Sequence, residues 1–398
     1  MNSLNDIIKS KIKVNIEFFN DEHEKLLCNK RRYPSDVVDR MKKLVSDGFM
    51  VDGYDFIEYY LFHNKRSGIE KNDFIEMIPS ASNMLRMHFD IKDNQLFKMR
   101  NIALDKGITE HIGESVGMLV ISHCFNILSA DWNFIPESNK VKTLDCSLAV
   151  SNNGLIELEA KGTSAIAINL SSPSSSITKK KKGKKSAKGN YYYGTITTMD
   201  TSNLTCYLLD PPGSDVKLDY VRLRLLNRLS YYYEVFRVIA PTSELIDILM
   251  ERIELLREKN QDIKSLGRLK PKNRSQFNYS TGSQPTFFFQ SYYNDKDGVK
   301  FGGRFFYLEK GRSLFIGVEN TLLSKIVDQS VDDILTVSDE LSYFEVNSLV
   351  DRNALQTTTR DHQVLEIKDK RFTNSERLRM RGRVYLKNGL ALGILSYS

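Results

Sequence analysis

The chain has 398 residues, 41% of them hydrophobic and 27% charged, which is the composition of a globular protein of two or three domains. No stretch approaches the roughly 20 apolar residues that span a bilayer, and the polar start of the chain has no apolar signal region, so we expect a cytoplasmic protein without a membrane segment. The formal net charge is +7, and four scattered cysteines without a CxxC pair, together with six histidines without an HxH or HxxxH pair, argue against a zinc site.

Helical patterns dominate the first hundred residues. Ser35 to Ser46 places apolar side chains on one helical stripe, and Gly48 ends it. A stronger helix is predicted from Thr109 to Leu128, with Thr109 as its N-cap and a break at Gly107 before it. We therefore expect a helical N-terminal domain over residues 1–105.

Three strands are predicted directly after that helix. They run from Ala130 to Ile135, from Thr143 to Val150 and from Leu155 to Gly162, and the Asn-Gly turn before Leu155 is a strong hairpin signal. The Ser-, Pro- and Lys-rich residues 171–190 predict a mobile or extended basic loop, with at most a short helix at its end. Strands then follow at Tyr191 to Thr198 and Leu204 to Leu209, which extends the sheet.

The second half of the chain predicts helices followed by an antiparallel meander. The helices cover Leu218 to Ile239 and Ser243 to Lys259, and the meander covers Thr286 to Val318. We expect three domains: the helical one over 1–105, an α/β domain over 106–260 with the basic insertion 171–190, and an α+β domain over 261–398.

The chemically informative residues lie in the predicted hairpin. Side chains alternate along a strand, so Glu157, Glu159 and Lys161 share one face while Ile156, Leu158 and Ala160 share the other. If the hairpin pairs its strands, Asp145 comes close to Glu159. Carboxylate oxygens are hard ligands for Mg²⁺, and a lysine beside a metal-bound water can position it or stabilise an anionic transition state. This combination suits phosphodiester hydrolysis.

Asp145, a spacer of thirteen residues, and Glu159-Ala160-Lys161 resemble the PD-(D/E)xK signature of restriction-endonuclease-like nucleases. The family pattern has an acidic residue on an upstream helix, an Asp on the second strand and (Asp/Glu)-x-Lys on the third, and Glu114 stands on the upstream helix. The resemblance implies a restriction-endonuclease-like mixed sheet core in which Glu114, Asp145 and Glu159 hold Mg²⁺ or Mn²⁺ and Lys161 assists the attacking water. Leu144 replaces the family's variable proline. The resemblance covers about a quarter of the chain.

The expected activity is thus that of a metal-dependent endonuclease, with DNA favoured over RNA on the family base rate. A free nuclease would harm its host, so we expect control by a partner chain or a role in defence against foreign DNA. Cutting both strands of a duplex would favour a homodimer. Two alternatives stay open: a catalytically inactive nucleic-acid-binding or interaction protein with a nuclease-like fold, and a solvated sheet edge on which Glu157, Glu159 and Lys161 form only cross-strand ion pairs.

Clustered positive charge also predicts a polyanionic partner. Seven of the ten residues at 179–188 are lysine, and these are the expected nucleic-acid contacts. They are Lys179, Lys180, Lys181, Lys182, Lys184, Lys185 and Lys188. A second cluster alternates arginines from Arg377 to Arg383. The tyrosines at 191–193 and 231–233 are expected mainly in the core, with base stacking as the alternative. A structural role is likewise expected for Arg222, Arg224 and Arg228, with contacts to backbone phosphates as the alternative.

Overall fold

The structure is a computed structural model that describes residues 4–63, 85, 88–93, 95–98, 106–134, 146–150, 154–164, 170–181, 190–199, 204–210, 219–240, 244–258, 291–294, 300–309, 311–319, 321–322, 325–326, 334–337, 340–351 and 377–397. It divides into two compact units. Unit 1 comprises Met1–Ser67 and Asn83–Tyr231, and unit 2 comprises Gly68–Ser82 and Tyr232–Ser398. Within the described ranges, no helix is long and apolar enough to cross a membrane.

Unit 1 is built on one mixed sheet. Its strands are β1 (Lys11–Phe18), β2 (Phe49–Asp52), β3 (Phe89–Lys92), β4 (Gln95–Lys98), β5 (Trp132–Phe134), β6 (Cys146–Val150), β7 (Gly154–Thr163), β8 (Asn190–Met199) and β9 (Leu204–Leu209). They are ordered β3-β4-β1-β9-β8-β7-β6-β5, with β2 paired to β1. The pairs β7–β8 and β1–β9 are parallel, whereas β5–β6, β6–β7 and β8–β9 are antiparallel. The predicted α/β class and the β6–β7 hairpin are confirmed.

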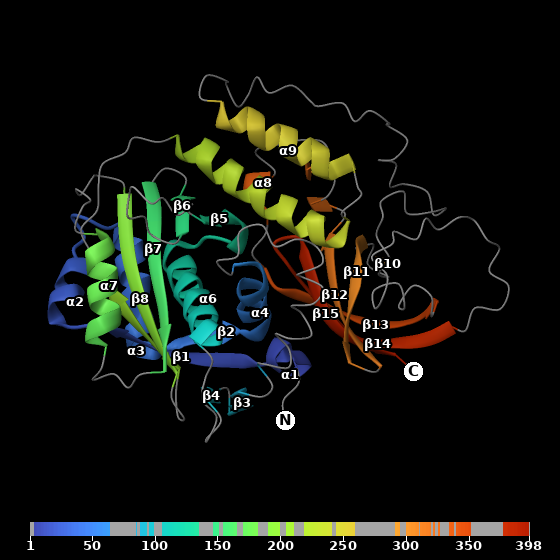
Figure 1. Cartoon of the computed structure of the whole chain (residues 1–398), viewed down its shortest axis with the longest axis horizontal. Helices are drawn as coiled ribbons and strands as arrows, with labels where there is room; N and C mark the ends of the chain where they lie inside the picture. Colours follow the sequence, from blue (N-terminus) through green and yellow to red (C-terminus); the bar gives the residue numbers. More distant parts are fainter. Residues whose placement is uncertain are drawn as a thin grey trace. The chain divides into compact units, whose positions relative to one another are not determined.

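Helices cover both faces of this sheet. They are α1 (Leu4–Lys9), α2 (Asp21–Leu27), α3 (Ser35–Asp47), α4 (Gly53–Phe62), α6 (Lys106–Phe125), the 3-10 turn η1 (Ser129–Asp131), α7 (Ser171–Lys181) and the first part of α8 (Tyr220–Ile239). Helix α6 lies on one side of β7 and β8, and α7 lies on the other (Figure 1). Helix α6 begins at Lys106, so Gly107 lies inside its first turn and the predicted break at Gly107 is wrong.

The first sixty residues belong to this sheet and do not form a separate helical domain. Strand β1 lies between β4 and β9, with Asn15 opposite Thr205. Downstream of β1, the Tyr33 hydroxyl donates to Asp210 Oδ1 at 2.9 Å, and Arg32 Nη1 donates to Oδ2 of the same carboxylate at 2.5 Å. The expectation of a helical domain over 1–105 overlooked the period-two pattern of β1, whose Ile12, Val14 and Ile16 are all buried.

Half of the predicted basic loop is helical. Residues Ser171–Lys181 form α7, and Ile177 on this helix is fully buried with Leu170, Ile196 and Leu209. Proline is tolerated in the first turn of a helix, where Pro173 stands, because the backbone N–H that it lacks has no intrahelical acceptor there. The buried Leu170 and Ile177 thus anchor a segment whose composition predicted a loop.

Unit 2 contains an antiparallel sheet, the rest of α8 and helix α9 (Glu244–Arg257). Its strands are β10 (Ser291–Asn294), β11 (Lys300–Glu309), β12 (Arg312–Glu319), β13 (Ser342–Asp351), β14 (Arg377–Lys387) and β15 (Leu390–Tyr397). The order is β10-β11-β12-β15-β14-β13, so the predicted three-strand meander is confirmed as one half of a larger sheet. One face of the sheet packs a core that includes Phe305, Phe315, Val346 and Val384.

A candidate catalytic centre on strand β7

Strand β7 is an interior strand with two chemically different faces. It pairs with β6 on one side and with β8 on the other. A methyl group on Gly117 of α6 would touch the Ala160 Cβ at 3.1 Å, so Ala160 faces α6. Lys161 pairs in register with Ile196, which packs in the same cluster as Ile177 of α7. Because side chains alternate along a strand, Glu157, Glu159 and Lys161 point to the α7 side of the sheet.

Helix α6 approaches β7 at backbone distance. A methyl group on Gly113 would lie 2.3 Å from both the Cα and the N of Gly162, and one on Gly162 would lie 1.7 Å from the Thr109 carbonyl oxygen. Glycine at both positions removes the side chains that normally separate a helix from a sheet. This contact sets the height of α6 above β7.

Glu159 and Lys161 form an ion pair on the α7 side. Lys161 Nζ lies 2.7 Å from Glu159 Oε1, and the side chains are 22% and 0% exposed, respectively. Glu157, two residues earlier on the same face, is 9% exposed. Burying charge is costly unless it is paired or bound to a metal. The alternative of a solvated sheet edge is therefore wrong, because β7 is an interior strand and both glutamates are buried.

Helix α7 covers the region beside this pair. Glu159 pairs in register with Gly194 of β8, and a methyl group on Gly194 would lie 2.7 Å from the Ile177 side chain. Helix α7 ends at Lys181, so the start of the lysine run belongs to the helix on the same side of the sheet as Lys161. Helix α7, which ends in the first lysines of the run, thus lies on the same side of the sheet as the buried Glu159 carboxylate.

The other predicted site residues have different placements. Glu114 is 1% exposed on α6, which covers the face of β7 opposite to Glu159, so the structure does not set the two carboxylates on one face. Asp145 lies outside the described residues, directly before Cys146, whose partner in the ladder is Leu158. Lys179, Lys180 and Lys181 form the end of α7, without described side chains. Lys182, Lys184, Lys185 and Lys188 lie outside the described residues.

A second buried charge cluster was not predicted. Asp131 is fully buried, and it accepts hydrogen bonds from Arg224 Nε at 2.8 Å and from Arg228 Nε at 2.6 Å. Burial alone would raise the pKa of Asp131, but Arg228 and Arg224 hold that pKa below its ordinary value. The alternative in which Arg224 and Arg228 contact phosphates is therefore wrong, because their guanidinium groups are committed to Asp131. The sequence signal for this buried cluster was an acidic residue, Asp131, within the largely apolar run 127–132.

A buried polar network extends from this cluster to α4. Glu58 accepts hydrogen bonds from the Ser129 hydroxyl and, at 2.7 Å, from the Tyr231 hydroxyl. The His63 ring stacks on Tyr231 with centroids 5.5 Å apart, and burial lowers its pKa to about 3. These hydrogen bonds join α4 to η1 and to α8, so they favour one arrangement of the three elements. The tyrosines at 191–193, together with Tyr231 and Tyr232, are buried, which confirms their expected place in the core.

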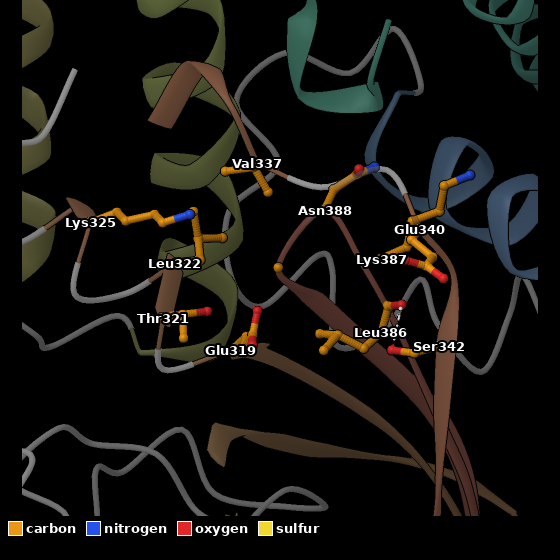
Figure 2. A pocket seen from close by; sticks show the side chains of 11 residues that line it. Glu319, Thr321, Leu322, Lys325, Val337, Glu340, Ser342, Leu386, Lys387 and Asn388 are labelled. Carbon is orange, nitrogen blue, oxygen red and sulfur yellow. Dashed lines mark hydrogen bonds between the residues drawn. The ribbon is translucent and has the colours of Figure 1, made fainter. Parts of the chain in front are cut away.

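Unit 2 holds a pocket that none of the predicted site residues lines. Its volume is about 430 Å³. Figure 2 shows Lys325 and Thr321 across the pocket from Glu340 and Ser342. Glu319 and Lys387 complete a lining of mixed charge, which does not favour a ligand of one sign.

Among the described residues, no three His, Cys, Asp or Glu side chains gather in a way that could hold a metal ion. Asp145 is not among those residues, so the carboxylate set that the resemblance implies is described only through Glu114 and Glu159. A scan against protein-family models and searches of curated proteins and of solved structures find no match to this chain.

Proposed function

We propose that the chain is a metal-dependent nuclease that hydrolyses phosphodiester bonds of nucleic acid, with Glu159 and Lys161 at its centre. The observation that carries the proposal is the ion pair on an interior strand between the buried Glu159 carboxylate and the partly exposed Lys161 ammonium. The order of elements supports it: α6 with Glu114, then β5, β6 and β7 follow one another as the PD-(D/E)xK resemblance implies.

We propose that carboxylates beside this pair hold a divalent cation. Glu159 offers a buried carboxylate, and Asp145 precedes β6 by one residue. In the β6–β7 ladder, Ser147 pairs with Glu157 and Cys146 with Leu158, so one further step of the same register would set Asp145 opposite Glu159. We propose that Asp145 and Glu159 hold Mg²⁺ or Mn²⁺, which need only one or two protein carboxylates. Glu114 is not included in this proposed metal site, because its helix covers the other face of β7.

The protein's own contribution to the proposed reaction is the positive charge of Lys161 and the fixed position in which that charge is held. A bound Mg²⁺ or Mn²⁺ supplies Lewis acidity and lowers the pKa of a coordinated water. Glu159 holds the Lys161 ammonium in one place, and β7 is kept rigid by pairing on both sides. An ammonium held in a largely buried site stabilises the negative charge that develops on the phosphoryl oxygens, because its interactions are less screened than in water.

The proposed substrate is nucleic acid, with DNA favoured and with a role in defence against foreign DNA. The lysine run that begins at the end of α7 supports a polyanion, because that helix covers the face on which Lys161 lies. The alternative is a catalytically inactive protein that uses the same surface only to bind nucleic acid.

The activity test uses the purified full chain with single- and double-stranded DNA and RNA in Mg²⁺, in Mn²⁺ and in chelator. We expect cleavage that requires the metal and falls by at least about a hundredfold in Lys161→Ala and in Asp145→Ala. Binding in chelator should stay intact. A wild-type protein that cleaves none of these substrates would favour the binding alternative, and variants that cleave normally would refute the site.

A neutral pair separates catalysis from structure. The double variant Glu159→Gln with Lys161→Met removes both charges at similar volume, and replacing a buried ion pair in this way is often neutral or stabilising. We expect a folded protein without cleavage. The matched control is Glu157→Gln on the same face, which should keep most activity. A structural ion pair without a catalytic role predicts the reverse, namely that the neutral double variant still cleaves.

A further inference from the structure

The unit 2 sheet carries an exposed row of polar side chains across four strands. Arg312 of β12 pairs with Ser396 of β15, Ser396 pairs with Arg381 of β14, and Arg381 pairs with Asn347 of β13. Directly paired residues of an antiparallel sheet share a face, so these four side chains form one line. All four are exposed. The line therefore runs across the sheet on an open surface.

The arginines of β14 lie on the face opposite to a core. Met380 and Val384 on the same strand are buried in the cluster with Phe305 and Phe315. Alternation then sends Arg379, Arg381 and Arg383 to the other face, about 7 Å apart from one to the next. Tyr385, the next residue on the arginine face, is buried, so the open part of this face spans Arg379 to Arg383.

Charge on this face is one-sided. Arg383 is committed to Glu345 of β13, to which its Nε and Nη2 donate at 2.8 and 2.5 Å. Glu345 is the one acid on this face among the side chains that the structure describes. Within the described part of the chain, no carboxylate pairs with Arg379 or Arg381. Among the described side chains, Arg379 and Arg381 thus have no carboxylate as a counter-charge.

An aromatic ring stands beside these cations. Tyr343 of β13 is 57% exposed, and the Arg383 guanidinium lies over its ring, 4.2 Å from the centroid. A ring with this exposure is accessible to a base that stacks on it. The cation fixes one face of the ring, and the ring is therefore presented as a rigid platform.

We propose that this face, defined by Tyr343, Asn347, Arg379, Arg381 and Ser396, binds a single strand of nucleic acid. Arginine, serine and asparagine side chains are among the usual donors to phosphate and sugar, and bases stack on exposed aromatic rings. A double helix keeps its bases inside, so the exposed ring favours an unpaired strand. The inference adds a binding site to the proposed nuclease function, which needs a nucleic acid substrate, but it does not depend on cleavage.

The test is binding of labelled single-stranded DNA and RNA oligonucleotides to the full chain in chelator, followed by fluorescence anisotropy over a series of salt concentrations. We expect Arg379→Ala with Arg381→Ala to weaken binding at least about tenfold, because two charge-assisted contacts are lost. The slope of log K against log salt should become shallower by about 1.4 for a single strand. Arg379→Lys with Arg381→Lys should keep that slope.

Two further variants test the ring and the ion pair. Tyr343→Ala should weaken binding while Tyr343→Phe preserves it, because stacking needs the ring and not the hydroxyl. Glu345→Gln should strengthen binding several-fold, since it frees Arg383 and removes a negative charge. Lys42→Gln with Lys43→Gln, on the exposed side of α3, is the matched control for the loss of two positive charges and should change binding little.

The outcomes separate this proposal from the nuclease proposal. Binding that depends on Arg379 and Arg381 in a protein that never cleaves would support this face and refute the nuclease. Cleavage in a protein whose Arg379→Ala with Arg381→Ala variant binds as the wild type does would refute this face alone. The face is also refuted if the wild type binds no oligonucleotide, if the Lys42→Gln with Lys43→Gln control loses as much affinity, or if the arginines matter only for binding to vesicles rich in phosphatidylserine.

Discussion

Replacing Gly113 by alanine tests the contact that positions α6 on the candidate centre. On an open helix surface, this change would stabilise the protein by about 1 kcal/mol, because alanine is the better helix former. Here the new methyl group would lie 2.3 Å from two backbone atoms of Gly162. Carbon atoms pack at about 3.5–4.0 Å, so the helix would have to withdraw by roughly 1 Å, and its buried face would lose a sizeable part of its dispersion energy. The net expectation is a loss of about 1–3 kcal/mol.

Gly117 provides a matched comparison on the same helix. A methyl group there would meet the Thr195 hydroxyl at 2.2 Å, which is a side-chain atom that a substitution can remove. Gly117→Ala should therefore be destabilising alone and largely rescued by Thr195→Ala. Gly113→Ala should not be rescued in this way, because its obstacle is the backbone of β7.

Urea denaturation followed by circular dichroism gives the free energy of unfolding for each variant. The close contact with Gly162 and helix propensity alone would change the free energy of unfolding in opposite directions. If Gly113→Ala raises the free energy of unfolding by about 1 kcal/mol, helix propensity alone decides the effect, and the close contact of α6 with Gly162 is refuted.

The remaining predictions concern the buried polar groups of unit 1. Asp131→Asn should lower the free energy of unfolding by about 3–5 kcal/mol, since it leaves Arg228, which is 1% exposed, without its counter-ion. The control Asp39→Asn, at the exposed pair with Lys30, should leave the free energy of unfolding nearly unchanged. Equal effects of the two variants in urea denaturation would contradict the buried network. Because burial lowers the pKa of His63 from 6.5 to about 3, its contribution to stability is complete above pH 6.5 and is lost as the pH falls towards 3, by about 2 kcal/mol at pH 5. His63→Gln should flatten this part of the stability profile, and a profile identical to that of the wild type between pH 7 and pH 5 would exclude His63 as its source.

Local patterns predicted the elements that carry the candidate sites. The β6–β7 hairpin, the common face of Glu159 and Lys161, and the strand with alternating arginines at Arg377–Lys387 all follow from the period of two along an extended chain. Such alternation depends only on neighbouring residues and is therefore readable before the fold is known. The same rule applied to Lys11–Phe18 would have found β1, which the expectation of a helical domain missed.

Long-range contacts decided which side chains of those elements are buried and which faces the helices cover. The sequence could place Glu159 and Lys161 on one face, but only pairing with β8 makes β7 an interior strand, and Glu159 is buried there beside Lys161. The sequence also set Glu114 on the helix before the sheet, while the glycine contact of Gly113 with Gly162 decided that this helix covers the opposite face. The burial of a side chain depends on residues that are distant in the sequence. The alternation along a strand therefore determines which side chains share a face, and only the tertiary structure determines which residues they contact.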